Sequence, residues 1–161
     1  MRATTEQDRK RRRRRRRIQV IIIYTAIAVG LAWFFESQAT TTIIFVRHAE
    51  KAATPPDDPG LTAAGQRRVA ELTRQLRDAD VVAGIDAVYS TPFRRTQETA
   101  QPIADALDLP INTYDPEDTE AVLERILKDH KGKIILVVGH SNTVPVLIAN
   151  LGASKKVPPI Q

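Results

Sequence analysis

Two histidines and three arginines stand just after short apolar runs of this 161-residue chain. They are Arg47, His48, Arg94, Arg95 and His140. An arginine guanidinium matches the charge and geometry of a phosphoryl group, and a neutral imidazole is a competent nucleophile toward phosphorus. If these side chains meet at one place, the chemistry that they predict is phosphoryl transfer without a metal ion.

The apolar runs themselves are typical of strands that are buried in a parallel sheet. They comprise Thr42–Val46, Asp86–Ser90, Ile111–Tyr114 and Ile134–Val138. Their alternation with longer helical patterns predicts an α/β fold with three α/β/α layers and a mainly parallel sheet. Because ligands of such sheets bind at the carboxyl ends of the strands, we expect the histidines and arginines to share that edge.

The helical patterns lie between the predicted strands. One runs from Thr62 to about Asp78 and a second from Thr96 to Leu107, each with its apolar residues on one face. A third is predicted to begin with Asp115 as N-cap and Pro116 in the first helical position. Residues 53–60, with three prolines, are expected to form a loop on the carboxyl side of the first strand.

Other chemistries lack their usual sequence signals. The chain has no cysteine, no glycine-rich dinucleotide motif and no phosphate-binding P-loop motif, so we expect neither a cofactor nor a metal site. Ser141 follows Gly139-His140 in the manner of an esterase nucleophile, but the second glycine of that motif is missing and no histidine follows. His130, beside lysines at a helix end, is expected to be a solvated cation.

Charge is distributed unevenly along the chain. The formal net charge is +5, yet residues 1–17 alone carry +8 and the remainder carries −3. The main body therefore lacks the basic surface that follows a nucleic-acid backbone, and we expect no nucleic-acid partner.

An apolar segment, Ile18–Phe35, directly follows the basic run. As a helix, its 18 uncharged residues would extend about 27 Å, close to the ~30 Å hydrocarbon core of a bilayer. Trp33 and the phenylalanines after it suit a lipid–water boundary, and the arginines mark the cytoplasmic end. The segment thus predicts a single-pass protein of the inner membrane.

This interpretation divides the chain into four parts. Residues 1–17 form a basic cytoplasmic tail, 18–35 the transmembrane anchor, 36–41 a linker, and 42–161 a periplasmic domain. The rival interpretation is a signal peptide that is cleaved near Ala39, which leaves the domain on the same side of the membrane.

Four segments together resemble the histidine phosphatase superfamily, the phosphoglycerate-mutase-like fold. In chain order they are VRHAEK, LTAAGQ, YSTPFRRTQETA and VVGHSNT, and the resemblance covers essentially residues 42–151. It implies that His48 is phosphorylated during turnover, that Arg47 and Arg95 bind phosphate oxygens, and that His140 completes the pocket, where we expect a protonated ring. Arg94 is a weaker candidate.

The resemblance also implies a general acid from the segment after the third strand. That segment offers Asp115, Glu117 or Asp118, of which Glu117 fits the offset best, and Glu50 is the alternative. Two features depart from the family pattern. Ala49 replaces the usual glycine, and the chain ends where relatives continue with a further strand, which predicts a domain that is short at its C-terminus.

The function predicted from these residues is hydrolysis of a phosphomonoester through a phosphohistidine intermediate, by a membrane-anchored domain. The short connection between the second and last strands leaves no room for the helices that enclose phosphoglycerate in relatives, so mutase activity is disfavoured. We expect a phosphorylated small molecule, glycan or lipid as substrate. The alternatives are a membrane-tethered module that binds phosphate without turnover, and a phosphatase of phosphohistidine proteins.

Overall fold

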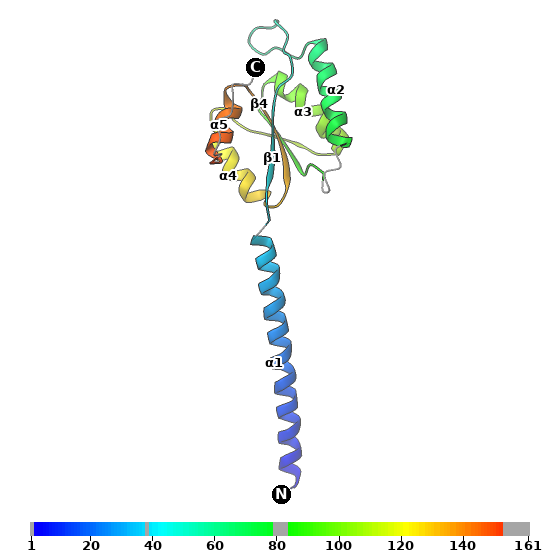
Figure 1. The fold of residues 1–161 in the computed structure, drawn as a ribbon, viewed down its shortest axis with the longest axis vertical. Coiled ribbons are helices and arrows are strands. Elements are labelled where there is room, and N and C mark those ends of the chain that lie inside the picture. Colours follow the sequence, from blue (N-terminus) through cyan, green and yellow to red (C-terminus); the bar gives the residue numbers. More distant parts are fainter. Residues whose placement is uncertain (1, 38, 79–83, 153–161) are drawn as a thin grey trace. The chain divides into compact units, whose positions relative to one another are not determined.

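The computed structural model describes residues 2–37, 39–78 and 84–152, arranged in two compact units, Met1–Ala39 and Thr40–Gln161 (Figure 1). The residues that end the chain, where a shortened C-terminus is expected, lie outside the described ranges, as does Gln38 beside the predicted cleavage point.

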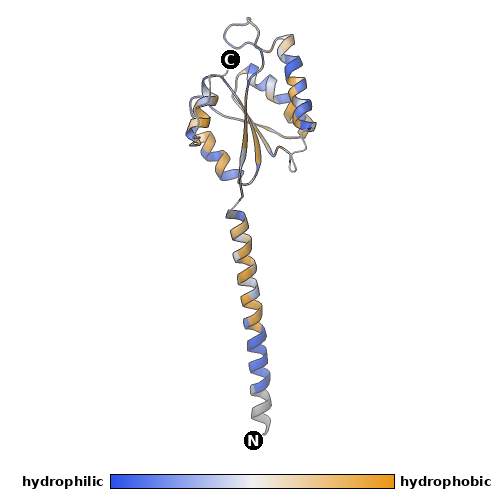
Figure 2. Cartoon of the chain, viewed as in Figure 1, coloured by the Kyte–Doolittle hydropathy of each residue, from blue (hydrophilic) through white to orange (hydrophobic). Residues whose placement is uncertain are grey.

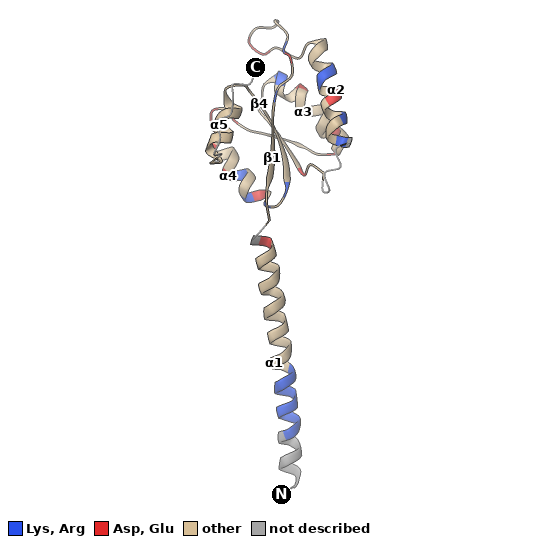
Figure 3. Ribbon diagram, viewed as in Figure 1, with Lys and Arg blue, Asp and Glu red and all other residues tan. Residues whose placement is uncertain are grey.

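The first unit is one helix, α1 (Arg2–Ser37). It is longer than the predicted anchor because the arginine run is itself helical, and arginine has a high helix propensity. Basic residues precede the apolar part, Ile18–Phe35, which contains no charged residue (Figures 2 and 3). By length and composition, the segment Arg9–Glu36 is able to cross a membrane.

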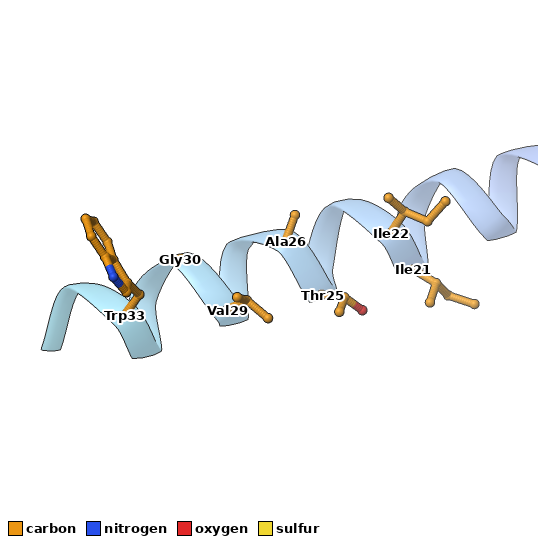
Figure 4. A pocket seen from close by; sticks show the side chains of 7 residues that line it. All are labelled: Ile21, Ile22, Thr25, Ala26, Val29, Gly30 and Trp33. Carbon is orange, nitrogen blue, oxygen red and sulfur yellow. The ribbon is translucent and has the colours of Figure 1, made fainter. Parts of the chain in front are cut away.

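Small residues leave a shallow apolar groove along the surface of α1. Its lining consists of Ile21, Ile22, Thr25, Ala26, Val29, Gly30 and Trp33 (Figure 4). A Cβ atom placed on Gly30 would meet no atom within 4 Å. The groove belongs to this helix alone and reflects small side chains between large ones.

The second unit is built on a four-stranded parallel sheet. The strands are β1 (Thr42–Arg47), β2 (Ala87–Ser90), β3 (Ile111–Thr113) and β4 (Ile134–Gly139). Their order across the sheet is β1-β4-β2-β3, and every pair is parallel. The predicted α/β fold is confirmed, and the observed strand ends differ from the predicted ones by one residue.

Helices cover both faces of this sheet (Figure 1). Two of them, α2 (Ala63–Asp78) and α3 (Arg94–Leu107), lie on one face, and α4 (Thr119–Asp129) and α5 (Thr143–Asn150) lie on the other. The chain runs across the sheet from β1 to β2 to β3 and then returns to β4. Since such crossovers are right-handed, reversing the direction places α4 on the opposite face.

The core follows the alternation of side chains along β4. Ile135 and Val137 pack with the apolar residues of α4 and α5, whereas Leu136 and Val138 pack with those of α3. All four side chains are fully buried. Burial on both faces explains why β4 is a continuous apolar run in the sequence.

The predicted start of the third helix was wrong. Asp115 is not its N-cap: the side chain of Asp115 accepts a hydrogen bond from the Glu117 N–H at 2.9 Å within a preceding turn. The helix α4 begins at Thr119, where Asp118 caps it by accepting from the Ala121 N–H at 3.0 Å. Asp115 and Asp118 each accept a hydrogen bond from a backbone N–H. Either one therefore fits the sequence pattern of a helix N-cap.

The expectation that the His130 side chain is fully solvated was also wrong. His130 ends α4, but its ring Nε2 lies 2.9 Å from the hydroxyl of Tyr89, and the two rings pack edge to face with centroids 5.7 Å apart. The half-buried ring is therefore part of the packing between α4 and β2.

Candidate active site

The carboxyl ends of β1 and β4 bring two histidines side by side. Arg47 is paired with Gly139, and the backbone N–H of His48 continues the ladder by donating to the Gly139 carbonyl at 3.0 Å. The rings of His48 and His140 consequently lie 5.5 Å apart between centroids. A Cβ on Gly139 would stand 2.9 Å from the Tyr114 hydroxyl, so glycine permits this close packing under the site.

A cavity of about 460 Å³ opens at this edge of the sheet. It is lined by Arg47, His48, Lys51, Phe93, Arg95, Pro116, Glu117, His140, Ser141, Asn142 and Thr143. The lining thus brings together all five residues that were predicted to act catalytically, and it leaves out Arg94. With both imidazoles neutral, three cationic side chains face one acidic side chain, which favours an anionic ligand.

The backbone fixes the orientation of the His48 ring. Its Nδ1 lies 2.7 Å from the carbonyl oxygen of Ala49. A carbonyl can only accept, so Nδ1 carries the proton and Nε2 keeps its lone pair for a ligand. Burial lowers the pKa of His48, and the positive charges of Arg95 and Arg47 lower it further. The ring is therefore unprotonated at neutral pH, with the lone pair of Nε2 available.

Ala49 lies away from the cavity. It is 3% exposed, and its N–H donates to the hydroxyl of Thr99 at 3.0 Å. The methyl group at this departure from the family pattern is therefore accommodated in the core, outside the cavity lining.

His140 is more deeply buried than His48. Burial lowers its pKa to about 4, and the nearby charge of Arg95 acts in the same direction. Its Nε2 lies 3.0 Å from the hydroxyl of Thr91. The expectation of a protonated ring is not met, because at neutral pH this imidazole is uncharged.

The two consecutive arginines at the start of α3 face different surroundings. The Arg95 side chain is 16% exposed, its guanidinium carbon lies 4.4 Å from the centre of the Phe93 ring, and Asp58 is 4.0 Å away. Arg94 points elsewhere: its Nε donates to Glu98 at 2.6 Å, and its side chain is 59% exposed. Arg95 is the one that can meet a ligand.

Among the candidate carboxylates, Glu117 alone lines the cavity. Asp115 and Asp118 accept backbone N–H groups, as described above. Glu50 instead pairs with Arg68 at 2.9 Å, and its pKa is lowered by backbone hydrogen bonding and, after that, by the Arg68 hydrogen bond. A carboxylate that is held ionised by an arginine is a poor proton donor, which leaves Glu117 as the candidate acid.

The motif LTAAGQ supports the backbone that follows His48. Thr62 caps α2 by accepting from the Gly65 N–H at 3.0 Å, and the Thr62 N–H donates to the Glu50 carbonyl at 2.8 Å. A Cβ on Gly65 would stand 2.5 Å from that same carbonyl oxygen. Glycine is thus required where the first turn of α2 meets the backbone next to the site.

Sequence reasoning missed several residues around the cavity. Lys51 adds a cation, and Phe93 packs against both Arg95 and the ring of His140, with a centroid distance of 5.3 Å to the latter. Phe93 stands in the segment TPFRR beside the predicted arginines, so the sequence did point to it. An aromatic residue just before a helix, however, more often packs in the hydrophobic core than lines a ligand site. Within the described ranges, no cluster of three or more metal-ligating side chains occurs.

Comparisons with known proteins show what the chain is similar to. The model of the histidine phosphatase superfamily (branch 1) matches residues 43–116. No curated protein is detectably similar in sequence. Among solved structures, the protein histidine phosphatase SixA complexed with tungstate is 24% identical with a TM-score of 0.62, and the match covers 73% of this chain and 80% of that one.

Two further solved structures extend the likeness. A phosphoserine phosphatase from Entamoeba histolytica is 18% identical with a TM-score of 0.56, over 70% of this chain and 80% of that one. A mycobacterial glucosyl-3-phosphoglycerate phosphatase is 12% identical with a TM-score of 0.55, over 66% and 77%. The domain from Thr40 onward has the histidine phosphatase fold, and the resemblance predicted from its motifs is confirmed.

Proposed function

We propose that the domain hydrolyses a phosphomonoester through a phosphohistidine intermediate. The observation that carries this proposal is the ring of His48, whose Nδ1 is held by a carbonyl while its other nitrogen borders a cavity with Arg47 and Arg95. A nucleophile with a fixed tautomer and a lowered pKa, next to two phosphate-binding side chains, has the parts that in-line attack on phosphorus needs.

The proposed reaction has two steps. In the first, Nε2 of His48 forms a bond to phosphorus while the ester P–O bond breaks, and Glu117 gives a proton to the departing oxygen. In the second, water attacks the phosphohistidine, Glu117 takes a proton from that water, and the N–P bond breaks to release phosphate. The arginines stabilise the charge that the transferring group carries in both steps.

Rapid-quench labelling with a phosphorylated substrate, followed by peptide mapping, tests this proposal. We expect the label on His48, lost in acid and stable in alkali as an N–P bond is. The His48→Ala variant should neither turn over nor become labelled, whereas His140→Ala should turn over slowly. Label on Ser141, or full activity of His48→Ala, would replace the proposal with a serine hydrolase. Phosphate binding without label or turnover would leave only a binding module.

We further propose that α1 anchors the domain in the inner membrane with its basic end in the cytoplasm. Two features support this proposal. The apolar segment of α1 is long enough to cross a membrane, and basic residues flank this segment on its N-terminal side only. An extracytoplasmic site favours a phosphorylated small molecule, glycan or lipid of the envelope as the substrate. A panel of such phosphomonoesters, offered to the full chain in detergent, ranks these classes by kcat/KM.

A phosphohistidine protein is the second candidate substrate. The structural likeness to the protein histidine phosphatase SixA favours it, whereas the proposed orientation of the domain opposes it. Including a phosphohistidine-containing protein in the same panel separates the two. A kcat/KM for this substrate far above that for every phosphomonoester would favour the second candidate.

A further inference from the structure

His140 is bound to a chain of two buried hydroxyl groups that the reaction as described does not use. Its Nε2 lies 3.0 Å from the Thr91 hydroxyl, which lies 2.7 Å from the Thr96 hydroxyl. Both threonines are fully buried, so solvent does not compete for these bonds. These hydrogen bonds run from Thr96 on α3, through Thr91 directly after β2, to the His140 ring, which borders the cavity.

Counting hydrogens along this chain identifies one fully bonded arrangement. The Thr96 hydroxyl lies 2.7 Å from the Phe93 carbonyl and 3.1 Å from the Thr91 carbonyl, and since carbonyls can only accept, Thr96 donates to this pair. Thr91 must then donate to Thr96, and His140 must donate from Nε2 to Thr91. In this arrangement His140 is the Nε2–H tautomer, and Nδ1 keeps a lone pair.

The other nitrogen of His140 is left for a ligand. In the described part of the chain, Nδ1 makes no hydrogen bond, and it is not among the buried polar atoms that lack a partner. Since His140 lines the cavity, we infer that its Nδ1 is open to the cavity. As an acceptor, however, Nδ1 would repel the oxygen atoms of a bound phosphoryl group.

Reversing the hydroxyl chain removes this conflict at little cost. If Thr96 donates to Thr91 and Thr91 donates to Nε2, the ring is the Nδ1–H tautomer. The Phe93 carbonyl still accepts from the backbone N–H groups of Thr96 and Gln97 at 3.1 and 3.0 Å, so it keeps its partners. Each hydroxyl keeps its own hydrogen and only rotates, while the ring exchanges its single proton with water.

We propose that Thr91 and Thr96 are positioning residues that let a neutral His140 donate a hydrogen bond from Nδ1 to the transferring phosphoryl group. This rests on the proposed function, since it assumes that the cavity binds a phosphoryl group. It assigns to His140 a donor role that needs no extra proton. That agrees with a ring that is neutral and buried beside Arg95.

Nitrogen-15 NMR of the full chain in detergent, labelled at histidine, tests the proposal. The chain has three histidines, and the variants His48→Ala and His130→Gln assign their signals. At neutral pH we expect His140 as the Nε2–H tautomer, and a switch to a neutral Nδ1–H tautomer when inorganic phosphate is added. A ring that stays Nε2–H with phosphate bound, or that becomes doubly protonated, would overturn the proposal.

Activity of two matched variants gives an independent test. Thr91→Ser keeps the hydroxyl and should retain kcat within about threefold, whereas the isosteric Thr91→Val should lose about ten- to a hundredfold. Equal losses in both variants would overturn the proposal, because packing alone would then explain them. If the protein hydrolyses phosphomonoesters while the tautomer does not switch, this inference fails and the proposed function stands. If phosphate shifts no histidine signal and no ester is hydrolysed, both fail.

Discussion

At the scale of single residues, the site depends on which of two adjacent arginines faces the cavity. Arg95 is held against the Phe93 ring at the cavity wall, while Arg94 is turned to Glu98 on the same helix. An N-terminal turn of a helix sends consecutive side chains about 100° apart, so only one of the pair can reach a given ligand.

Substitution of the arginines should separate their roles. Each charge-assisted hydrogen bond contributes roughly 1.5–3 kcal/mol, so Arg47→Ala and Arg95→Ala should each lower kcat/KM about ten- to a hundredfold or more. Arg94→Ala should have a much smaller effect and serves as the matched control. Steady-state kinetics with one phosphomonoester measures all three, and a larger loss for Arg94→Ala would contradict the assignment.

The pKa of His48 predicts how activity depends on pH. Burial and nearby positive charge place this pKa below 6.5, so the neutral ring, which is the proposed nucleophile, is present throughout the neutral range. We expect kcat/KM to fall as the pH drops through that lowered pKa. Lys51→Ala removes one of the charges that lower the pKa, and it should shift this acid limb to higher pH.

The control for this shift is Lys128→Ala, an exposed lysine of α4 that does not line the cavity. Because all variants are measured with the same substrate, ionisation of the substrate itself cancels from the comparison. An acid limb that is identical in Lys51→Ala and the unaltered chain would show that the limb does not report His48.

Glu117 is the residue whose role depends most on the leaving group. If it protonates the departing oxygen, Glu117→Gln should slow hydrolysis of an alkyl phosphate by about a hundredfold or more. Hydrolysis of p-nitrophenyl phosphate should change far less, since that leaving group departs as an anion. Asp115→Asn and Glu50→Gln are the controls, and equal losses for both substrates in Glu117→Gln would point to a binding role.

At the scale of elements, the strands and the start of α2 could be predicted from sequence to within one residue, whereas the start of α4 could not. The apolar run of β4 is buried on both faces, so its signal is strong and local. The start of α4 depends on which of two aspartates finds the free N–H groups, which short-range patterns do not decide. α5 went unpredicted because its short apolar run directly follows the site motif and lacks a side-chain cap.

The candidate site, like the elements, could be predicted only in part. The carboxyl ends of strands could be placed at one edge from the topology of parallel sheets, and this brought His48, His140 and the arginines together in the prediction. The partner of each ring nitrogen could not be predicted, because Thr91 and His140 are 49 positions apart and meet only through the pairing of β2 with β4. Such contacts require the register of the strands.

The docking of α2 onto the backbone beyond His48 gives a prediction for this element. Gly65→Ala would force a methyl group against the Glu50 carbonyl oxygen, so α2 must shift. We expect a loss of about 1–3 kcal/mol in the free energy of unfolding and a lower kcat. The neighbouring exposed residue gives the control, Ala64→Ser, which should cost only a few tenths of a kcal/mol to about 0.5. Urea unfolding followed by circular dichroism measures both, and equal stabilities would contradict the close contact.

At the scale of the whole molecule, charge and hydropathy are divided between two units. Ten of the 24 basic residues precede the apolar part of α1, where residues 1–17 carry a net charge of +8, and the second unit is mildly acidic (Figure 3). The cavity nevertheless gathers Arg47, Lys51 and Arg95. Its preference for an anion thus comes from local placement rather than from the net charge of the domain.

The orientation of α1 is the last prediction. Because cytoplasmic flanks of membrane helices are rich in arginine and lysine, a β-lactamase fused after Gln161 should be active outside the cytoplasm and confer resistance. Changing Arg9–Arg17 to glutamate should weaken that resistance, whereas changing the same residues to lysine should preserve it. The size of the product in the membrane fraction separates an intact anchor from cleavage near Ala39. A domain that resists added protease in intact spheroplasts, together with an inactive fusion, would place it in the cytoplasm and would favour the phosphohistidine protein as substrate.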